Sequence, residues 1–147
     1  MIDRSFMKIT AKVDYACRAL IELGLHWPNK SPLQIHAISK QQKIPAGFLI
    51  HILITLKHLG FVESTRGKSG GYFLKRSPAD ITLWDIISQF DGTGLLATKS
   101  DGGLERKITE IIWREIDSDV QKKMRSMTLL NICEKVRSQN KTLLYEI

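Results

Sequence analysis

Residues 63–75, "ESTRGKSGGYFLK", place three glycines, one arginine and two lysines in thirteen positions. Glycine-rich segments with basic residues commonly bind phosphate, either of a nucleotide or of a nucleic acid backbone. A nucleotide-binding P-loop requires a helix directly after its glycines. Here "FVESTR" alternates apolar and polar side chains, and "GYFLK" again has the pattern of a strand. The stretch therefore predicts a β-hairpin whose glycines at the tip "GKSG" tolerate positive φ, and it argues against a nucleotide site.

The segments before this hairpin have the apolar spacing of helices. The first, "TAKVDYACRALIELGLHW", begins with Thr10 as N-cap and stops at "WPNKSP". A short helix, "PLQIHAISKQQ", and a longer one, "IPAGFLIHILITLKHLG", follow with a turn of about four residues, "QQKI", between them. Pro45 fits the first helical turn and Gly60 a C-terminal stop. Two helices joined tightly and followed by a basic hairpin are typical of a winged helix-turn-helix, so the phosphate is expected to be that of DNA.

The segments after the hairpin predict three more helices. "ITLWDIISQF" begins with Thr82 as N-cap and Asp85 at the capping-box position, and the loop "DGTGLLATKSDGG" follows it. A long helix of about twenty residues starts at Leu104, and Thr128 caps a last short helix, "LLNICEKVRS". The long helix carries a stripe of apolar residues, widened by Ile111 and formed by Ile108, Ile112, Ile116, Val120 and Met124. This stripe favours a homodimer, and the alternative is packing against the N-terminal half of the same chain.

The expected fold is mainly α with a small β-hairpin. Residues 1–78 are expected to form a winged helix-turn-helix DNA-binding domain, and residues 79–147 a helical dimerisation region that is also the candidate region for an effector. Charge follows this division: residues 1–76 contain twelve Lys and Arg against four Asp and Glu, and residues 77–147 contain ten against eleven. The excess of positive charge in the first half indicates a polyanion-binding surface, with chance clustering as the alternative.

Several classes of protein are disfavoured. No apolar run approaches the roughly 20 residues that span a bilayer, and the N-terminus lacks the apolar core of a signal peptide. A cytoplasmic protein without membrane contact is therefore expected. Cys17 and Cys133 are too few for a thiolate metal site, and reduced buried thiols are favoured over a disulfide. His51 and His58 lie too far apart on one helix to hold a metal ion without a third ligand, and no catalytic triad or carboxylate pair is evident, so no enzyme is expected.

Five segments resemble the Rrf2 family of bacterial transcription regulators. They are "MKITAKVDYACRAL", "GFLIHILITLKHLGFVESTRGKSGGYFLKR", "ITLWDII", "IIWREI" and "MTLLNI", in order from Met7 to near the end of the chain. The resemblance implies a homodimer of winged-helix units, joined through the long helix, that reads a palindromic operator. Many relatives hold an iron–sulfur cluster on three cysteines in the loop before that helix. The loop "DGTGLLATKSDGGLERK" contains no cysteine or histidine, so no cluster or other cofactor is expected. The effector is left open between a small molecule and a partner protein.

Residues early in a recognition helix point at base edges in the major groove. In the predicted recognition helix these residues are Pro45, Ala46, Gly47, Ile50 and His51. Ile50 can contact a thymine methyl group and His51 can hydrogen-bond a guanine acceptor. The alternative for Ile50 is burial in the core, although Ile52, Leu53 and Leu56 already fill the inner face of the helix.

The wing tip and four flanking side chains supply the expected contacts to the DNA backbone. The tip consists of Arg66, Gly67, Lys68 and Ser69. Arginine suits a narrow minor groove, whereas Lys68 and Ser69 suit phosphate oxygens. Further phosphate contacts are expected from Lys8, Thr10, Lys40 and Lys43. The competing hypothesis is a protein-interaction module that binds a metabolic enzyme and whose basic half is incidental.

Overall fold

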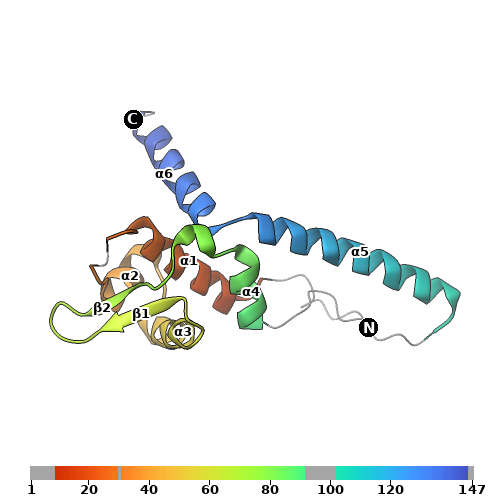
Figure 1. Ribbon diagram of the computed structural model, residues 1–147, viewed down its shortest axis with the longest axis horizontal. Helices are drawn as coiled ribbons and strands as arrows, with labels where there is room; N and C mark the ends of the chain where they lie inside the picture. Colours follow the sequence, from red (N-terminus) through yellow and green to blue (C-terminus); the bar gives the residue numbers. More distant parts are fainter. Residues whose placement is uncertain (1–8, 30, 92–101, 146–147) are drawn as a thin grey trace.

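The computed structural model describes residues 9–29, 31–91 and 102–145. It is mainly helical with one two-stranded antiparallel sheet, which confirms the predicted fold class (Figure 1). In chain order the elements are α1 Ala11–Leu25, α2 Ile35–Gln42, α3 Ala46–His58, β1 Val62–Thr65, β2 Gly71–Leu74, the 3-10 turn η2 Pro78–Asp80, α4 Leu83–Asp91, α5 Leu104–Ser126 and α6 Leu129–Tyr145. None of the described helices combines the length and apolar character that crossing a membrane would need.

Helix α1 lies at the centre of the core. Its N-terminus is capped as expected, because the Thr10 side chain accepts a hydrogen bond of 3.3 Å from the Val13 N–H. Ala16, Ala19 and Leu20 are completely buried, and α1 packs against α2, α3, α4 and α6. One hydrophobic cluster therefore joins the helix-turn-helix to segments from the second half of the chain.

A short turn connects α2 to α3. The N–H groups of Lys43 and Ile44 both donate to the carbonyl of Ser39, and the Ser39 hydroxyl donates back to the Ile44 carbonyl at 2.6 Å. Lys43 has a left-handed backbone, with φ of 53°. Gln42 still belongs to α2, so the turn is shorter than the "QQKI" expected. Pro45 precedes the first helical turn as N-cap of α3, since its carbonyl accepts the first helical hydrogen bonds.

The hairpin forms as predicted, with Val62 paired to Leu74 and Thr65 paired to Gly71. Gly67 in the tip has φ of 105°, which glycine adopts without strain. Leu33, just before α2, exchanges two backbone hydrogen bonds of 2.8 Å with Tyr72. A Cβ atom on Gly71 would collide with the Leu33 carbonyl, so this close approach requires glycine.

The two caps predicted in the second half are present. Thr82 and Asp85 form a reciprocal capping box, with hydrogen bonds of 2.9 and 3.1 Å. Thr128 caps α6 by accepting a 3.1 Å hydrogen bond from the Asn131 N–H. The prediction of a short last helix was wrong, because α6 continues for 17 residues to Tyr145. The added segment "QNKTLLY" contains no glycine or proline that would stop a helix.

Helix α5 has 23 residues and extends away from the rest of the molecule (Figure 1). None of its residues is buried. Its C-terminal end is held against α4, because the Leu83 N–H donates a 2.8 Å hydrogen bond to the Met127 carbonyl and Arg125 stacks on the Trp84 ring at 5.1 Å.

The contact between Gly71 and Leu33 leads to a stability prediction. Gly71→Ala should lower the free energy of unfolding by roughly 2 kcal/mol and the Tm by roughly 4–8 °C, because the added methyl group meets backbone atoms that cannot rotate away. Gly47→Ala is the control: nothing lies within 4 Å of the added Cβ, and alanine is the better helix former. Thermal unfolding followed by circular dichroism should therefore show an unchanged or higher Tm for Gly47→Ala. Equal Tm values for the two variants would contradict the contact.

Candidate nucleic-acid interface

Helix α3 turns one face to the core and the other to solvent. Leu49, Ile52, Leu53 and Leu56 are at most 4% exposed, so the inner face is filled as expected. Ala46, Gly47 and His51 are exposed. Ile50 is 40% exposed, and the alternative that it is buried in the core is therefore wrong.

The exposed face of α3 is unusually apolar. Between Pro45 and Ile54, His51 is the only residue whose side chain can form hydrogen bonds. Phe48 is 65% exposed and Ile54 is 43% exposed, and neither was among the residues selected from the sequence. The position of Ile54, four residues after Ile50, places both on the same side of the helix and was the available signal. The next polar residue, Thr55, donates its hydroxyl to the His51 carbonyl at 3.0 Å.

The wing tip stands beside the helix-turn-helix. Arg66, Gly67, Lys68 and Ser69 are all exposed. Within the ranges that the structure describes, neither Arg66 nor Lys68 forms an ion pair, so both charges are available to a ligand.

Two contacts missing from the sequence reasoning orient the hairpin. The Gln34 side-chain amide donates to the Lys68 carbonyl at 3.0 Å. Lys57, in the last turn of α3, donates to the Ser64 hydroxyl of β1 at 2.7 Å. These contacts connect the wing to both helices of the helix-turn-helix. The first could not be found from local spacing, because its partners are 34 residues apart; the second joins the end of α3 to the strand that follows it, seven residues on.

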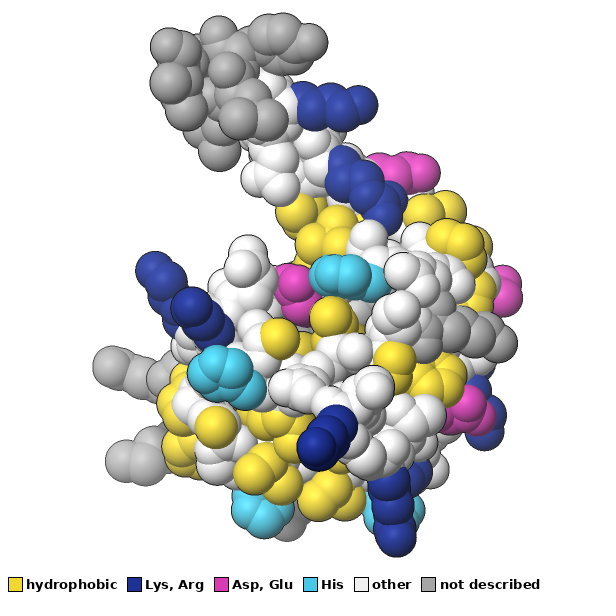
Figure 2. All heavy atoms as spheres, turned by 90° about the vertical axis from the view of Figure 1, so that its left-hand side faces the viewer, with side chains coloured by type: hydrophobic (Ala, Val, Ile, Leu, Met, Phe, Trp, Pro, Cys, Tyr) yellow, Lys and Arg dark blue, Asp and Glu magenta, His cyan; other side chains and the backbone are white. Residues whose placement is uncertain are grey.

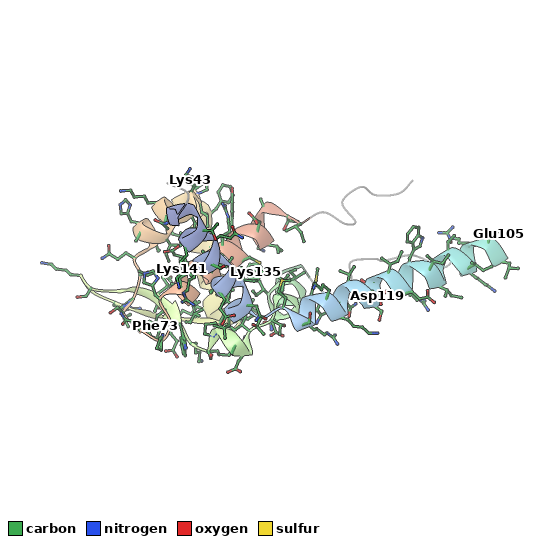
Figure 3. All side chains as sticks on the ribbon, turned by 90° about the horizontal axis from the view of Figure 1, so that it is seen from above. Lys43, Phe73, Glu105, Asp119, Lys135 and Lys141 are labelled. Carbon is green, nitrogen blue, oxygen red and sulfur yellow. The ribbon has the colours of Figure 1, made fainter. Side chains whose placement is uncertain are left out.

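The expected flanking contacts occupy different positions. Lys40 and Lys43 are exposed at the end of α2 and in the turn. Figure 3 shows Lys43 pointing outward from this edge of the molecule. Thr10 is exposed, and its hydroxyl caps α1. Lys8 lies outside the described residues. Seen from the side of the wing, Lys and Arg side chains protrude at several points, with apolar patches between them (Figure 2).

The apolar stripe of α5 is exposed over most of its length. Six large side chains are 37–69% exposed: Leu104, Ile108, Ile111, Ile112, Trp113 and Ile116. Val120 and Met124 are only half-buried, near the end that is held against α4. Figure 3 shows Glu105 and Asp119 on the part of α5 that leaves the body of the molecule. Among the described residues, the first part of the stripe is therefore not covered by the N-terminal half, which was the alternative to a dimer.

The two cysteines serve as packing residues. Cys133 of α6 is fully buried, and its Sγ donates a weak hydrogen bond of 3.8 Å to the Ile21 carbonyl of α1. Burial raises the pKa of the Cys17 thiol to about 11, and the Asp14 carboxylate acts in the same direction. Burial also raises the pKa of Cys133, which Arg137 partly opposes. Both groups are free thiols, and the protonated form dominates at neutral pH.

This set of donors does not fit an iron–sulfur cluster. Such clusters are commonly held by four thiolates, whereas this chain has two cysteines, on different helices and with raised pKa values. In the described part of the chain, no group of three or more His, Cys, Asp or Glu side chains is arranged to hold a metal ion.

Comparisons with known proteins agree with this geometry. The sequence model of the Rrf2 family, described as iron-dependent transcriptional regulators, matches residues 9–135. A putative HTH-type transcriptional regulator of Synechocystis is 32% identical over 137 residues, which cover 90% of this chain and 91% of that protein. The HTH-type transcriptional regulator IscR of Vibrio atlanticus is 34% identical over 84% of this chain and 73% of its own. The structure of CymR, the global cysteine regulator of B. subtilis, has a TM-score of 0.78 at 26% identity and covers 87% of this chain and 97% of its own. The chain therefore belongs to the Rrf2 family of transcriptional regulators.

Proposed function

We propose that this protein binds a palindromic DNA operator as a homodimer, without an iron–sulfur cluster, and regulates transcription in the cytoplasm with no enzymatic activity. The observation that carries the proposal is the position of the basic wing beside the exposed face of α3. An α-helix fits the major groove, and a wing at its side reaches the adjacent backbone and minor groove. In this proposal residues 1–78 provide the DNA contacts and residues 79–147 the dimer contacts and the effector response.

The DNA contacts divide by chemistry. Pro45, Ala46, Gly47, Ile50 and His51 form the first two turns of α3 and its cap, which would enter the major groove. Arg66 would lie in the minor groove, where negative potential concentrates over A·T-rich sequence. Lys8, Thr10, Lys40, Lys43, Lys68 and Ser69 would bind phosphate oxygens, with Gly67 allowing the tip to approach closely. Only His51 would hydrogen-bond a base, whereas many Lys and Arg side chains would contact phosphates. Affinity is therefore expected to come mainly from contacts to the DNA backbone.

The dimer would form through α5. Burying a large apolar side chain contributes about 1.5–3 kcal/mol, so the exposed stripe favours association with a second copy. We assign Ile108, Ile112 and Ile116 to the centre of the interface, with Val120 and Met124 at the end nearest α4. A two-fold axis through this helix pair would relate the two copies of α3. Because the two copies would contact the same bases in opposite orientations, the dimer would select a palindromic sequence.

The absence of a suitable set of thiolates supports regulation without a cluster. A signal would then come from a small molecule or a partner protein that acts on α5 and the loop before it. Selection of bound fragments from a random duplex pool tests the proposal directly, because a palindromic consensus is expected. A protein-interaction module that binds a metabolic enzyme would instead show no retention on duplex DNA at moderate salt.

The wing provides the first functional prediction. Arg66→Ala should weaken binding to the selected operator and relax any A·T preference beneath the wing. Lys68→Ala should weaken binding to all duplexes alike and lower the slope of log K against log salt by about one. Fluorescence anisotropy over a salt series measures both effects. If both variants lose affinity equally and keep the same A·T preference, the distinction between the two residues is wrong.

The second prediction concerns α5. The double variant Ile112→Lys, Ile116→Lys should be monomeric, because pairing would place four like charges in an apolar interface. Half-sites should then be bound singly and weakly. Sedimentation velocity measures the change against a Gln139→Lys, Asn140→Lys control, which adds the same charge at exposed positions on α6. An unchanged dimer in the first variant would place the interface elsewhere.

The third prediction tests the absence of a cluster. Protein purified without oxygen should be colourless, contain no stoichiometric iron and bind the selected operator in that state. Cys17→Ala should bind with the same affinity, because the thiol is assigned a packing role. Visible absorbance spectra, iron analysis and anisotropy provide the measurements. A brown preparation with bound iron would show that the thiols, or other groups of the dimer, hold a cluster after all.

A further inference from the structure

The solvent face of α3 presents apolar surface where a DNA reader usually presents hydrogen-bonding groups. Ile50 and Ile54 lie one turn apart on this face, and both are exposed. His51 is the single hydrogen-bonding side chain of the first two turns. Large apolar side chains gathered at one exposed place indicate an interaction surface rather than a solvated one. The occupant must therefore offer apolar groups to this helix.

The charge around α3 shows what kind of occupant this is. From Ser31 to Arg76 the chain contains seven Lys and Arg but one acidic residue, Glu63. Lys75 lies 4.0 Å from this carboxylate. The apolar face is thus framed by uncompensated cations in the turn before α3 and in the wing. An apolar partner protein would not need this frame, whereas DNA, which is a polyanion, would.

We propose that α3 reads its operator mainly through the methyl groups of thymine, with Ile50 and Ile54 as the specificity-determining residues. This inference rests on the proposed DNA-binding function. The C5 methyl of thymine is the apolar group that base edges present in the major groove, and apolar side chains recognise it. His51 adds one hydrogen bond to a neighbouring base.

Helix geometry gives the spacing of these contacts. Residues four apart rise by about 6 Å along an α-helix, and base pairs rise by about 3.4 Å. Ile50 and Ile54 therefore suit two methyl groups about two base pairs apart in each half-site. Methyl recognition also predicts that 5-methylcytosine, which carries a methyl group at the corresponding place, partly replaces thymine.

The test uses the duplex most enriched by the full-length protein from a random pool. Each thymine of a half-site is replaced in turn by deoxyuridine, which removes the methyl group and leaves base pairing intact. The affinity of the wild-type protein should fall about fourfold when one contacted methyl group is removed from one half-site. It should fall about sixteen-fold when the equivalent methyl group is removed from both half-sites. At the same positions, a 5-methylcytosine·guanine pair should be bound more tightly than a cytosine·guanine pair.

The variants assign each methyl group to a side chain. Ile50→Ala and Ile54→Ala should each bring the ratio of thymine to uracil affinity close to one at a single position of the half-site. His51→Ala is the matched control on the same face: it should weaken binding but keep both ratios. Circular dichroism melts confirm that each variant folds, which is expected because all three side chains are exposed.

The outcomes separate this inference from the proposed function. If a duplex is enriched but every deoxyuridine substitution changes affinity less than twofold, DNA binding stands and methyl recognition is overturned. Methyl recognition by Ile50 and Ile54 is also overturned if both isoleucine variants keep the wild-type ratio of thymine to uracil affinity at every position. If no duplex is enriched, the proposed function fails and this inference fails with it, and the apolar face then belongs to a protein interface.

Discussion

The close approach of Gly71 to Leu33 decides how the wing lies against the helix-turn-helix. A two-stranded hairpin alone is only marginally stable in water. Here the paired backbone hydrogen bonds between Leu33 and Tyr72 attach it to the segment that begins α2. The Gln34 side-chain amide also donates a hydrogen bond to the carbonyl of Lys68, which belongs to the wing tip. Because the same segment leads into the helix-turn-helix, the wing and α3 are held in a fixed relative position, which the proposed contact with two grooves would require.

Helix α3 carries apolar side chains on both its buried face and its exposed face. Its inner side chains fill the core beside α1, and its outer isoleucines remain exposed. Exposure of these side chains to water is unfavourable, and a partner that covers them would remove that cost. In the proposed DNA complex, phosphate contacts from the surrounding cations would supply affinity, and methyl contacts from the apolar centre would discriminate between base pairs. Discrimination would then depend on shape more than on hydrogen bonding.

The second half of the chain also has two parts. Helix α6 belongs to the core, since Leu129 and Cys133 pack into the same cluster as α1. The approach is close, because a Cβ atom on Gly24 would lie 2.8 Å from the Cys133 sulfur. Helix α5 instead leaves the body and exposes its stripe. Helix α5 is connected to the core through α4, which itself packs against α1; the family as a whole is described as iron-dependent.

The sequence alone predicted those features of the structure that depend on interactions between residues close together in the chain. The capping box of Thr82 and Asp85, the hairpin pairing and the stripe of α5 connect residues that are close in sequence, so spacing was enough to predict them. Tertiary structure decided the rest. Between Pro45 and Ile54 the only polar side chain of α3 is His51, so the sequence left burial of Ile50 open as an alternative; packing of α3 against α1 decides that Ile50 and Ile54 are exposed. The attachment of the wing joins residues 39 positions apart, and the contact of Cys133 with α1 spans 112. Such contacts depend on how the chain folds back on itself, which no local pattern encodes.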